Sequence, residues 1–302
     1  MSNREVKDLS ASVHRRLLNK AREENRPFNE LLQYYAMERF LYRLSKSPYS
    51  EKFVLKGALM LVVWNAPPSR PTSDIDLLGI IENDVDAIAT IAREICAQEV
   101  ESDGITFDAN SVSGETIAEV DEYQGVRVRI RGNLGPALLN IQLDVGFGDS
   151  VIPSPVLLTY PVLLDMPKPT LRGYSRESMI AEKLQSIARF GMLNSRMKDF
   201  FDIWLLSRQY GFDGKTLRKA IGKTFNNRGT DASPELIVLI DDFSRAEMKS
   251  SQWQAFCRMN RLESVPLNLE EVAQSIAEFI SPLLSGESFE GAWTPPGPWV
   301  PV

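Results

Sequence analysis

Two stretches of the chain alternate between apolar and polar residues with a period of two. Residues 126–131 read Val-Arg-Val-Arg-Ile-Arg, and residues 139–145 place three polar side chains, the last of them Asp144, between four aliphatic ones. Successive side chains of a strand point to opposite faces, so each stretch is predicted to be a strand with one aliphatic and one polar face. The fold must therefore contain a sheet whose aliphatic face is covered.

The elements around these strands predict an α+β fold, with a mixed sheet, flanking helices and a C-terminal helical domain. The first fifty residues have apolar residues at helical spacing, in two helices separated by Asn25–Pro27. The next elements are predicted as a strand at Phe53–Leu55, a buried helix at Ala58–Trp64, a buried strand at Thr72–Ile81 and a helix at Asp84–Gln98. The predicted parts are an N-terminal helical segment (1–50), a core (51–165) and a C-terminal domain (166–302).

The C-terminal part begins after a proline-rich stretch, Pro153–Pro169, that predicts an extended connector. Ser175 is suited to cap a helix that ends at Phe190, before Gly191. A second helix is predicted from Asn194 or Ser195 to about Gln209, and a last one at Leu267–Leu284. The tail, Gly291–Val302, holds two tryptophans and four prolines and is expected to be extended, packing either on the body or on a partner.

The composition limits where the protein acts and what it binds. A net charge of −6 disfavours non-specific coating of duplex nucleic acid, so any contact with RNA or DNA requires a local basic patch. The two cysteines, Cys96 and Cys257, form no CxxC pair and are expected to be inert thiols. Without an apolar signal segment or a membrane-length apolar run, the chain is expected to be cytoplasmic, with no membrane contact.

The strongest candidate for chemistry is the pair Asp74 and Asp76. Residues two apart on a strand share a face, so the two carboxylates lie side by side and repel each other unless a cation lies between them. Mg²⁺, or Mn²⁺ in its place, suits such hard oxygen ligands left open to substrate phosphates. Asp144 is the candidate third carboxylate, as metal ligand and general base, if its strand lies beside Thr72–Ile81. By itself the pair is more often only the charged end of a strand.

A helix start precedes this pair. Lys56 and Gly57 follow the first strand, and the helix that then begins at Ala58 would offer backbone N–H groups and a positive dipole end to a triphosphate. Arg70 and Thr72, just before the acidic pair, are placed to meet phosphate as well. The nucleotide-binding set is therefore predicted to include Lys56, Gly57, Ala58, Arg70 and Thr72.

The segments Leu55–Leu59 and Arg70–Leu77 together resemble the first motif of the AbiEii/AbiGii toxin family. The resemblance extends from about Phe53 to Leu206. It implies a DNA polymerase β-like nucleotidyltransferase fold, an NTP substrate, and a toxin of a type IV toxin–antitoxin, abortive-infection system with a cognate antitoxin. Some relatives add nucleotides to the 3′ end of tRNA, so tRNA is the expected acceptor. Ala58 departs from the Gly-Gly or Gly-Ser of many superfamily members and removes a serine hydroxyl contact to phosphate.

Two later segments, Ser175–Leu184 and Arg196–Ile203, look like the family's next motifs. Lys183 lies at the edge of the apolar stripe of its helix, and the resemblance favours it as a catalytic, nucleotide-binding cation with Asp199 closing the site. For Asp202 function and structure are equally favoured. The alternative is a structural ion-pair network of Asp199 and Asp202 with Arg176, Arg189 or Lys183.

Two other functions stay open at this point. The same chemistry could act on a hydroxyl of a protein or small molecule, or the fold could be catalytically decayed and serve as a binding partner. The arginine face of residues 126–131 could grip an RNA backbone, although most such stripes are solvated surface.

Overall fold

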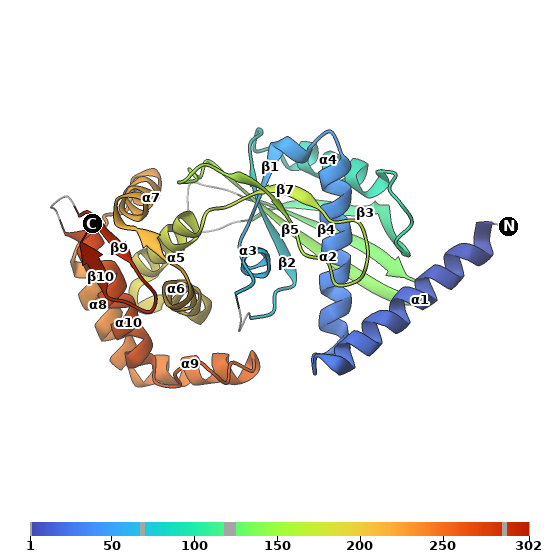
Figure 1. The fold of residues 1–302 in the computed structure, drawn as a ribbon. Helices are drawn as coiled ribbons and strands as arrows, with labels where there is room; N and C mark the ends of the chain where they lie inside the picture. The colour runs from blue at the N-terminus through green and yellow to red at the C-terminus, as the bar shows by residue number, and fades with distance from the viewer. Residues whose placement is uncertain (1, 67–69, 118–124, 286–288, 302) are drawn as a thin grey trace. The chain divides into compact units, whose positions relative to one another are not determined.

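The computed structural model describes residues 2–66, 70–117, 125–285 and 289–301. The chain forms two compact units. The first contains Met1–Asn65, Pro71–Gly148 and Val156–Gly173, and the second contains Ala66–Arg70, Asp149–Pro155 and Tyr174–Val302. The N-terminal helices thus belong to the same unit as the large sheet (Figure 1).

The first unit is built on a seven-stranded mixed sheet in the order β3-β4-β5-β2-β1-β7-β6. Its strands are β1 (Phe53–Lys56), β2 (Asp74–Gly79), β3 (Ile105–Ile117), β4 (Gly125–Leu134), β5 (Ala137–Phe147), β6 (Val156–Thr159) and β7 (Thr170–Gly173). β2 and β5 are parallel, as are β1 and β7, and the remaining neighbours are antiparallel. The alternating stretches in the sequence are confirmed as strands β4 and β5.

Three strands of this sheet, β3, β6 and β7, depart from the sequence prediction, which placed no strand at Thr170–Gly173. β3 was not predicted, because its residues are largely polar and its register shifts at a bulge between Asp108 and Ser113, which interrupts the alternation. β6 lies within the stretch expected to be an extended connector, and it pairs with β7 at the edge of the sheet.

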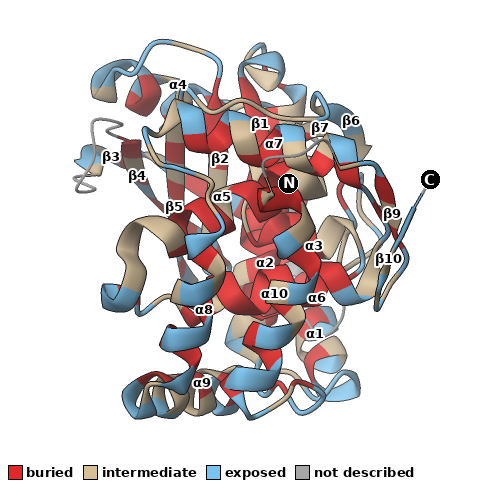
Figure 2. Cartoon of the chain, turned by 90° about the vertical axis from the view of Figure 1, so that its left-hand side faces the viewer, coloured by how far each residue is buried: buried red, intermediate tan, exposed pale blue. Residues whose placement is uncertain are grey.

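The helices of the first unit are α1 (Ser2–Glu23), α2 (Phe28–Lys46), α3 (Leu59–Val63) and α4 (Val85–Ala97), with a 3₁₀ turn at Ser50–Lys52. Asp84 caps α4 by accepting a hydrogen bond from the backbone of Ala87 at 2.6 Å. α4 packs on β3, where the α-carbon of Gly114 faces Val85 and Ala89. The aliphatic face of β4 and β5 is buried in this unit (Figure 2).

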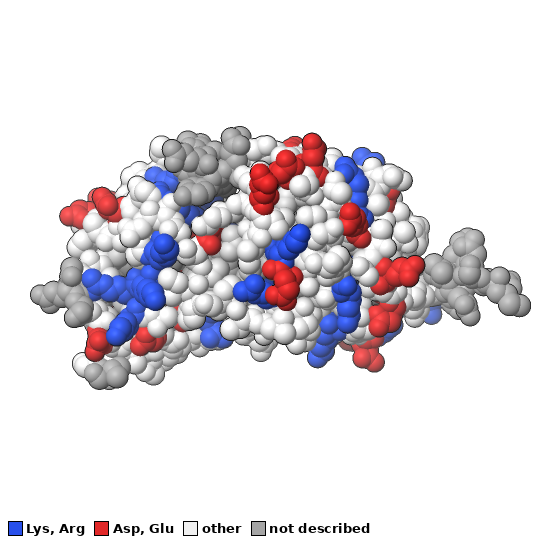
Figure 3. Space-filling model, turned by 90° about the horizontal axis from the view of Figure 1, so that it is seen from above, with Lys and Arg blue, Asp and Glu red and all other residues white. Residues whose placement is uncertain are grey.

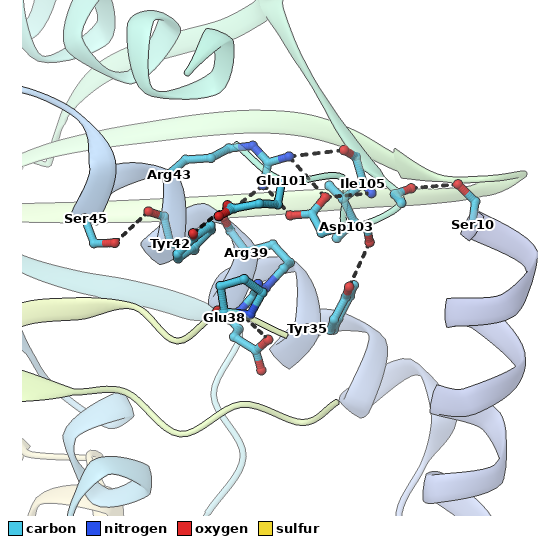
Figure 4. Close-up of polar contacts among 12 residues, drawn as sticks. Ser10, Tyr35, Glu38, Arg39, Tyr42, Arg43, Ser45, Glu101, Asp103 and Ile105 are labelled. Atoms are coloured by element: carbon cyan, nitrogen blue, oxygen red, sulfur yellow. Dashed lines mark hydrogen bonds and ion pairs between the residues drawn. The ribbon is translucent and has the colours of Figure 1, made fainter. Parts of the chain in front are cut away.

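Helix α2 is buried over most of its length, including three of its charged residues. Arg43 donates two hydrogen bonds to the carboxylate of Asp103, at 2.7 and 3.1 Å (Figure 4). Glu38 forms an ion pair with Arg39 at 2.8 Å and accepts a hydrogen bond from the backbone of Leu163 at 2.7 Å. Each buried charge therefore has a partner, which allows a helix with these residues to lie inside the unit.

The second unit is mainly helical. Its helices are α5 (Arg176–Phe190), α6 (Met197–Gln209), α7 (Gly214–Asn227), α8 (Glu235–Arg245), α9 (Glu247–Met259) and α10 (Leu269–Leu284), with a 3₁₀ turn at Gly191–Leu193. Ser175 caps α5 and Gly191 follows its end, as predicted. α6 begins at Met197, later than predicted, and its N-cap Arg196 makes no side-chain cap. α7, α8 and α9 were not predicted.

The C-terminal tail packs back onto this unit, one of the two outcomes expected from the sequence. β9 (Gly291–Trp293) and β10 (Trp299–Pro301) form a small sheet with β8 (Phe212–Asp213). The indole of Trp293 donates a hydrogen bond to the carbonyl of Ser207 at 2.6 Å, and Trp299 stacks on Phe279 with ring centroids 5.7 Å apart.

Both cysteines are buried. Burial raises the pKa of Cys96 to about 12 and that of Cys257 to about 11, so neither forms a thiolate at neutral pH. The burial of both thiols agrees with the expectation that they are inert. Within the described residues, no helix combines the length and the apolar character that crossing a bilayer requires.

Candidate metal and nucleotide site

Three carboxylates meet on the polar face of the first unit's sheet. Asp74 and Asp76 lie on β2, and the parallel register with β5 places Asp144 directly beside Asp76. One oxygen from each of the three carboxylates lies within 4.8 Å of the others, and all three residues are half-buried. The expected role of Asp144 required its strand to lie beside β2, and the register meets that condition.

A row of four charged residues crosses the sheet at this point. Lys56 on β1 pairs with Asp76, Asp76 with Asp144, and Asp144 with Arg127 on β4. The two acids are therefore flanked by a cation at each end of the row. Since like charges repel at this spacing, the flanking cations reduce but do not cancel the negative charge of the three carboxylates.

Arg127 is bound to the third carboxylate. Its Nε donates to Oδ1 of Asp144 at 2.8 Å and its Nη2 donates to Oδ2 at 2.7 Å, while Gln142 Nε2 donates to Oδ2 at 3.2 Å. The hydrogen bonds with Asp144 raise the pKa of Arg127 above its ordinary value. A carboxylate offers about four lone-pair positions, so these three donors leave one on Oδ1 for another ligand.

The arginine stripe therefore differs from the RNA-gripping surface considered from the sequence. Besides Arg127, Arg129 forms an ion pair with Glu115 on β3 at 2.7 Å, with both side chains half-exposed. Two of its three arginines thus already have carboxylate partners within the sheet.

Gly57 is required by the close approach of Asp76. Its φ of +67° is a left-handed conformation, and a Cβ added there would lie 1.9 Å from Oδ2 of Asp76. Any other residue would displace the carboxylate, so the glycine forms a cradle for Asp76. Ala58 follows in helical conformation at the N-cap of α3.

Thr72 contacts the acidic pair directly. Its hydroxyl donates a short hydrogen bond to Oδ1 of Asp74, and its backbone N–H donates to the hydroxyl of Tyr34 at 3.2 Å. Gln33 of α2 donates to the carbonyls of Ser73 and Asn140 at 3.2 and 2.9 Å, which ties β2 to β5. These supporting hydrogen bonds were not predicted from the sequence. Only the contact of Gln142 could have been expected from the sequence, because Gln142 lies two residues before Asp144 on the same strand face.

A second charged cluster lies in the second unit and contains Arg70, Lys183, Asp199 and Asp202. The Nζ of Lys183 lies 3.0 Å from Oδ1 of Asp199 and 3.3 Å from Oδ2 of Asp202. Arg70 donates two hydrogen bonds to Asp202, at 3.0 and 2.9 Å. Asp199 also contacts Arg196 at 3.1 Å. An ion-pair network was one alternative from the sequence, and the cations that join Lys183 in it are Arg70 and Arg196 rather than Arg176 or Arg189.

Burial and charge oppose each other in this cluster. Burial alone would raise the pKa of Asp202, but the attraction of Arg70 and Lys183 outweighs it and holds the pKa of that carboxyl below its usual range. Burial likewise opposes the charge of Lys183, but Asp199 and Asp202 raise the pKa of its ammonium above the ordinary value. Lys183 and Asp202 are thus buried in their charged forms, each with an oppositely charged side chain within ion-pair distance.

The three sheet carboxylates fit a divalent cation. They offer hard oxygen ligands within reach of one another, are partly open to solvent, and include a residue, Asp76, whose position depends on the absence of a Cβ at Gly57. Mg²⁺ is typically bound in this way, by a few carboxylates together with substrate phosphates.

Comparison with known proteins identifies a family. The model of the nucleotidyl transferase AbiEii toxin, type IV TA system, matches residues 39–278. No curated protein matches the chain. Its fold is similar to the crystal structure of JHP933 from Helicobacter pylori, which is 15% identical with a TM-score of 0.49, over 83% of this chain and 93% of that one. A second H. pylori crystal structure, of a candidate nucleotidyltransferase, is 15% identical with a TM-score of 0.46, over 83% and 96%. At these TM-scores neither structure bears on function.

Proposed function

Because the chain belongs to the family of nucleotidyl transferase AbiEii toxins of type IV toxin–antitoxin systems, we propose that it transfers a nucleoside monophosphate from an NTP to an acceptor hydroxyl at the 3′ end of tRNA. The observation that carries the proposal is the convergence of Asp74, Asp76 and Asp144, with one oxygen of each within 4.8 Å of the others. Such a constellation is suited to Mg²⁺ or Mn²⁺ and to phosphoryl transfer.

The three carboxylates would hold the metal, and their neighbours would hold the carboxylates. The hydroxyl of Thr72 orients Asp74, and Arg127 with Gln142 orients Asp144. The missing side chain of Gly57 leaves room for the carboxylate of Asp76. A bound Mg²⁺ supplies positive charge that stabilises the phosphate oxygens in the transition state. These contacts support a preformed site in which little rearrangement precedes the reaction.

In the proposed reaction, the acceptor hydroxyl oxygen forms a bond to the α-phosphorus of the NTP. The bond from that phosphorus to the bridging oxygen of the β-phosphate breaks, and pyrophosphate leaves with the bonding electrons. Because the one position that the hydrogen bonds of Asp144 leave open holds the metal, the proton of the hydroxyl passes to water, and Lys56 with the backbone at Gly57 and Ala58 binds the phosphates. Phosphate-binding roles for Arg70 and Lys183, with Asp199 as the partner of Lys183, are a separate part of the proposal.

As a toxin, the enzyme would stop translation by blocking tRNA 3′ ends during abortive infection. This role places it in the cytoplasm and requires a cognate antitoxin that restrains it. The family supports the toxin–antitoxin context, and the acceptor and the restraint are proposals.

The test is incubation of the protein with each α-labelled NTP, Mg²⁺ and a mixed tRNA pool. Wild type is expected to label RNA with at least one NTP, and Asp76→Ala is expected to lower the rate by about a thousandfold or more. Asp108→Asn is the matched control, because Asp108 is an exposed carboxylate on β3 outside the cluster of three. Persistence of RNA labelling in Asp76→Ala would overturn the proposal.

The same assay separates the other functions. Label on protein or on a small molecule, with none on RNA, would replace tRNA by that acceptor. No transfer with any NTP, together with no Mn²⁺ binding at Asp74 and Asp76, would indicate a catalytically decayed fold. Lys183→Met tests the second cluster, because loss of phosphate binding would raise the KM for NTP while the variant stays folded.

A further inference from the structure

Helix α7 carries an unusual charge for this protein. It contains four basic residues and no acidic residue between Gly214 and Asn227, in a chain with a net charge of −6. An acidic protein can bind a polyanion only through a local concentration of positive charge.

The lysines of α7 form one exposed row. Lys215, Lys219 and Lys223 are spaced by four residues, so consecutive lysines lie about 6 Å apart along the helix axis. All three are exposed, whereas Leu217 and Ile221 lie on the opposite, buried face. Figure 3 shows a group of Lys and Arg side chains at the left of the face it views, where Figure 1 places α7.

Compared with two cations on other helices, the lysine row has few and distant acidic partners. Lys20 pairs with Glu24 at 2.8 Å, and Arg245 pairs with Asp241 at 2.9 Å. By contrast, Lys215 reaches Glu290 only at 3.8 Å. Lys219 and Lys223 form no ion pair with any carboxylate of the described chain. Like charges four residues apart destabilise a helix, so nothing within α7 favours this arrangement.

A glycine lies in the same face. Gly222 follows Lys215 by seven residues, two helical turns, and a Cβ added to it would meet no atom within 4 Å. Packing therefore does not require glycine there, although glycine in a helix interior is less stable than alanine. What the missing side chain provides is access from outside to the helix backbone, in the middle of the lysine row.

We propose that the basic face of α7, formed by Lys215, Lys219, Gly222 and Lys223, binds the sugar–phosphate backbone of the RNA acceptor. Evenly spaced ammonium groups match a chain of single negative charges, and the glycine lets a phosphate or ribose approach the helix closely. The choice of RNA as the ligand rests on the proposed function, whereas the exposed positive charge of the face is observed in the structure.

The test measures RNA binding without chemistry. Fluorescence anisotropy with a labelled tRNA pool, without NTP and with EDTA, compares wild type with Lys215→Gln/Lys219→Gln/Lys223→Gln over a range of salt concentrations. Each phosphate contact contributes about 0.7 to 0.9 to the slope of log K against log salt, so the triple variant should lose about 2 to 3 from the slope. Lys20→Gln/Arg245→Gln, which removes two paired cations, should match wild type. An unchanged slope in the triple variant overturns the proposal.

Gly222→Ala supplies a second, independent measurement. It should raise the melting temperature by roughly 2–4 °C, since alanine is the better helix former, yet weaken RNA binding several-fold. A folded variant with unchanged RNA affinity would show that RNA does not approach the helix backbone, and that part of the proposal would be wrong.

Failure of this proposal can be told from failure of the proposed function. Asp76→Ala should bind RNA as wild type does while transferring no label. If wild type labels RNA but the triple variant binds it equally well, the surface is wrong and the function stands. If wild type binds vesicles containing phosphatidylserine but not RNA, the face serves a membrane and the RNA proposal fails.

Discussion

The two charged clusters of this protein differ in how deeply their carboxylates are buried and in how many cations surround them. Asp199 and Asp202 are fully buried, and Lys183, Arg70 and Arg196 lie around them within ion-pair distance. Asp74, Asp76 and Asp144 are half-buried and close together, with Arg127 in an ion pair with Asp144 and Lys56 opposite Asp76 on the neighbouring strand. The buried cluster has three cations for two carboxylates, whereas the half-buried one has three carboxylates for two flanking cations and keeps negative charge suited to a cation from solution.

The same substitution should therefore have different effects in the two clusters. Asp202→Asn leaves the buried Arg70 and Lys183 without their shared carboxylate and is expected to cost about 3–5 kcal/mol of unfolding free energy. Asp76→Asn, measured in EDTA, is expected to change stability by less than about 1 kcal/mol, since it also relieves repulsion. Urea unfolding of both variants measures the difference, and equal losses would remove the distinction between the clusters.

Glu38 sharpens the comparison, because it is buried with a single cation. Burial raises its pKa to about 7, against the opposing effect of Arg39. The folded state therefore binds the proton of Glu38 more tightly than the unfolded chain does. The resulting contribution to the free energy of unfolding is fully present below about pH 4.5 and is lost as the pH rises through about 7. Unfolding free energy should fall by up to about 3 kcal/mol over that interval. Glu38→Gln should flatten the profile, and an equally steep profile in the variant would assign the titration to another group.

Metal should stabilise the half-buried cluster only. At a hundred times its Kd, Mg²⁺ is expected to add about 2.7 kcal/mol to the unfolding free energy of wild type. Asp76→Asn should lose this increment, and EDTA should abolish it in wild type. Thermal unfolding with and without Mg²⁺ measures it, and stabilisation that survives in Asp76→Asn would place the metal elsewhere.

Arg127 orients one of the three carboxylates of the half-buried cluster and is expected to affect its affinity for a metal ion. Because it orients Asp144 and leaves one lone pair of Oδ1 open, Arg127→Met should weaken Mn²⁺ binding about 10- to 100-fold, measured by electron paramagnetic resonance titration. Arg127→Lys should recover part of the affinity, and Arg129→Met, which removes a cation paired with Glu115, should bind as wild type. Tighter Mn²⁺ binding in Arg127→Met would instead make Arg127 a competitor of the metal.

Local pattern in the sequence determined much of the fold. The period of two predicted β4 and β5, the serine and glycine signals predicted both ends of α5, and the spacing of Asp74 and Asp76 placed both on one face. These features depend on a few consecutive residues, whose geometry is the same in any protein. Where the pattern was interrupted, as at the bulge in β3, the element was missed.

Tertiary structure alone decided which charges meet. Arg70 lies four residues before Asp74 in sequence and was predicted to bind phosphate there, yet it pairs with Asp202, which is 132 residues away. Arg127, predicted as solvated surface or an RNA contact, binds Asp144 because β4 and β5 are in register at that pair. The sequence specifies which face of its own strand or helix a side chain occupies. Its partner across strands or helices depends on register and packing, which are set by residues far away along the chain.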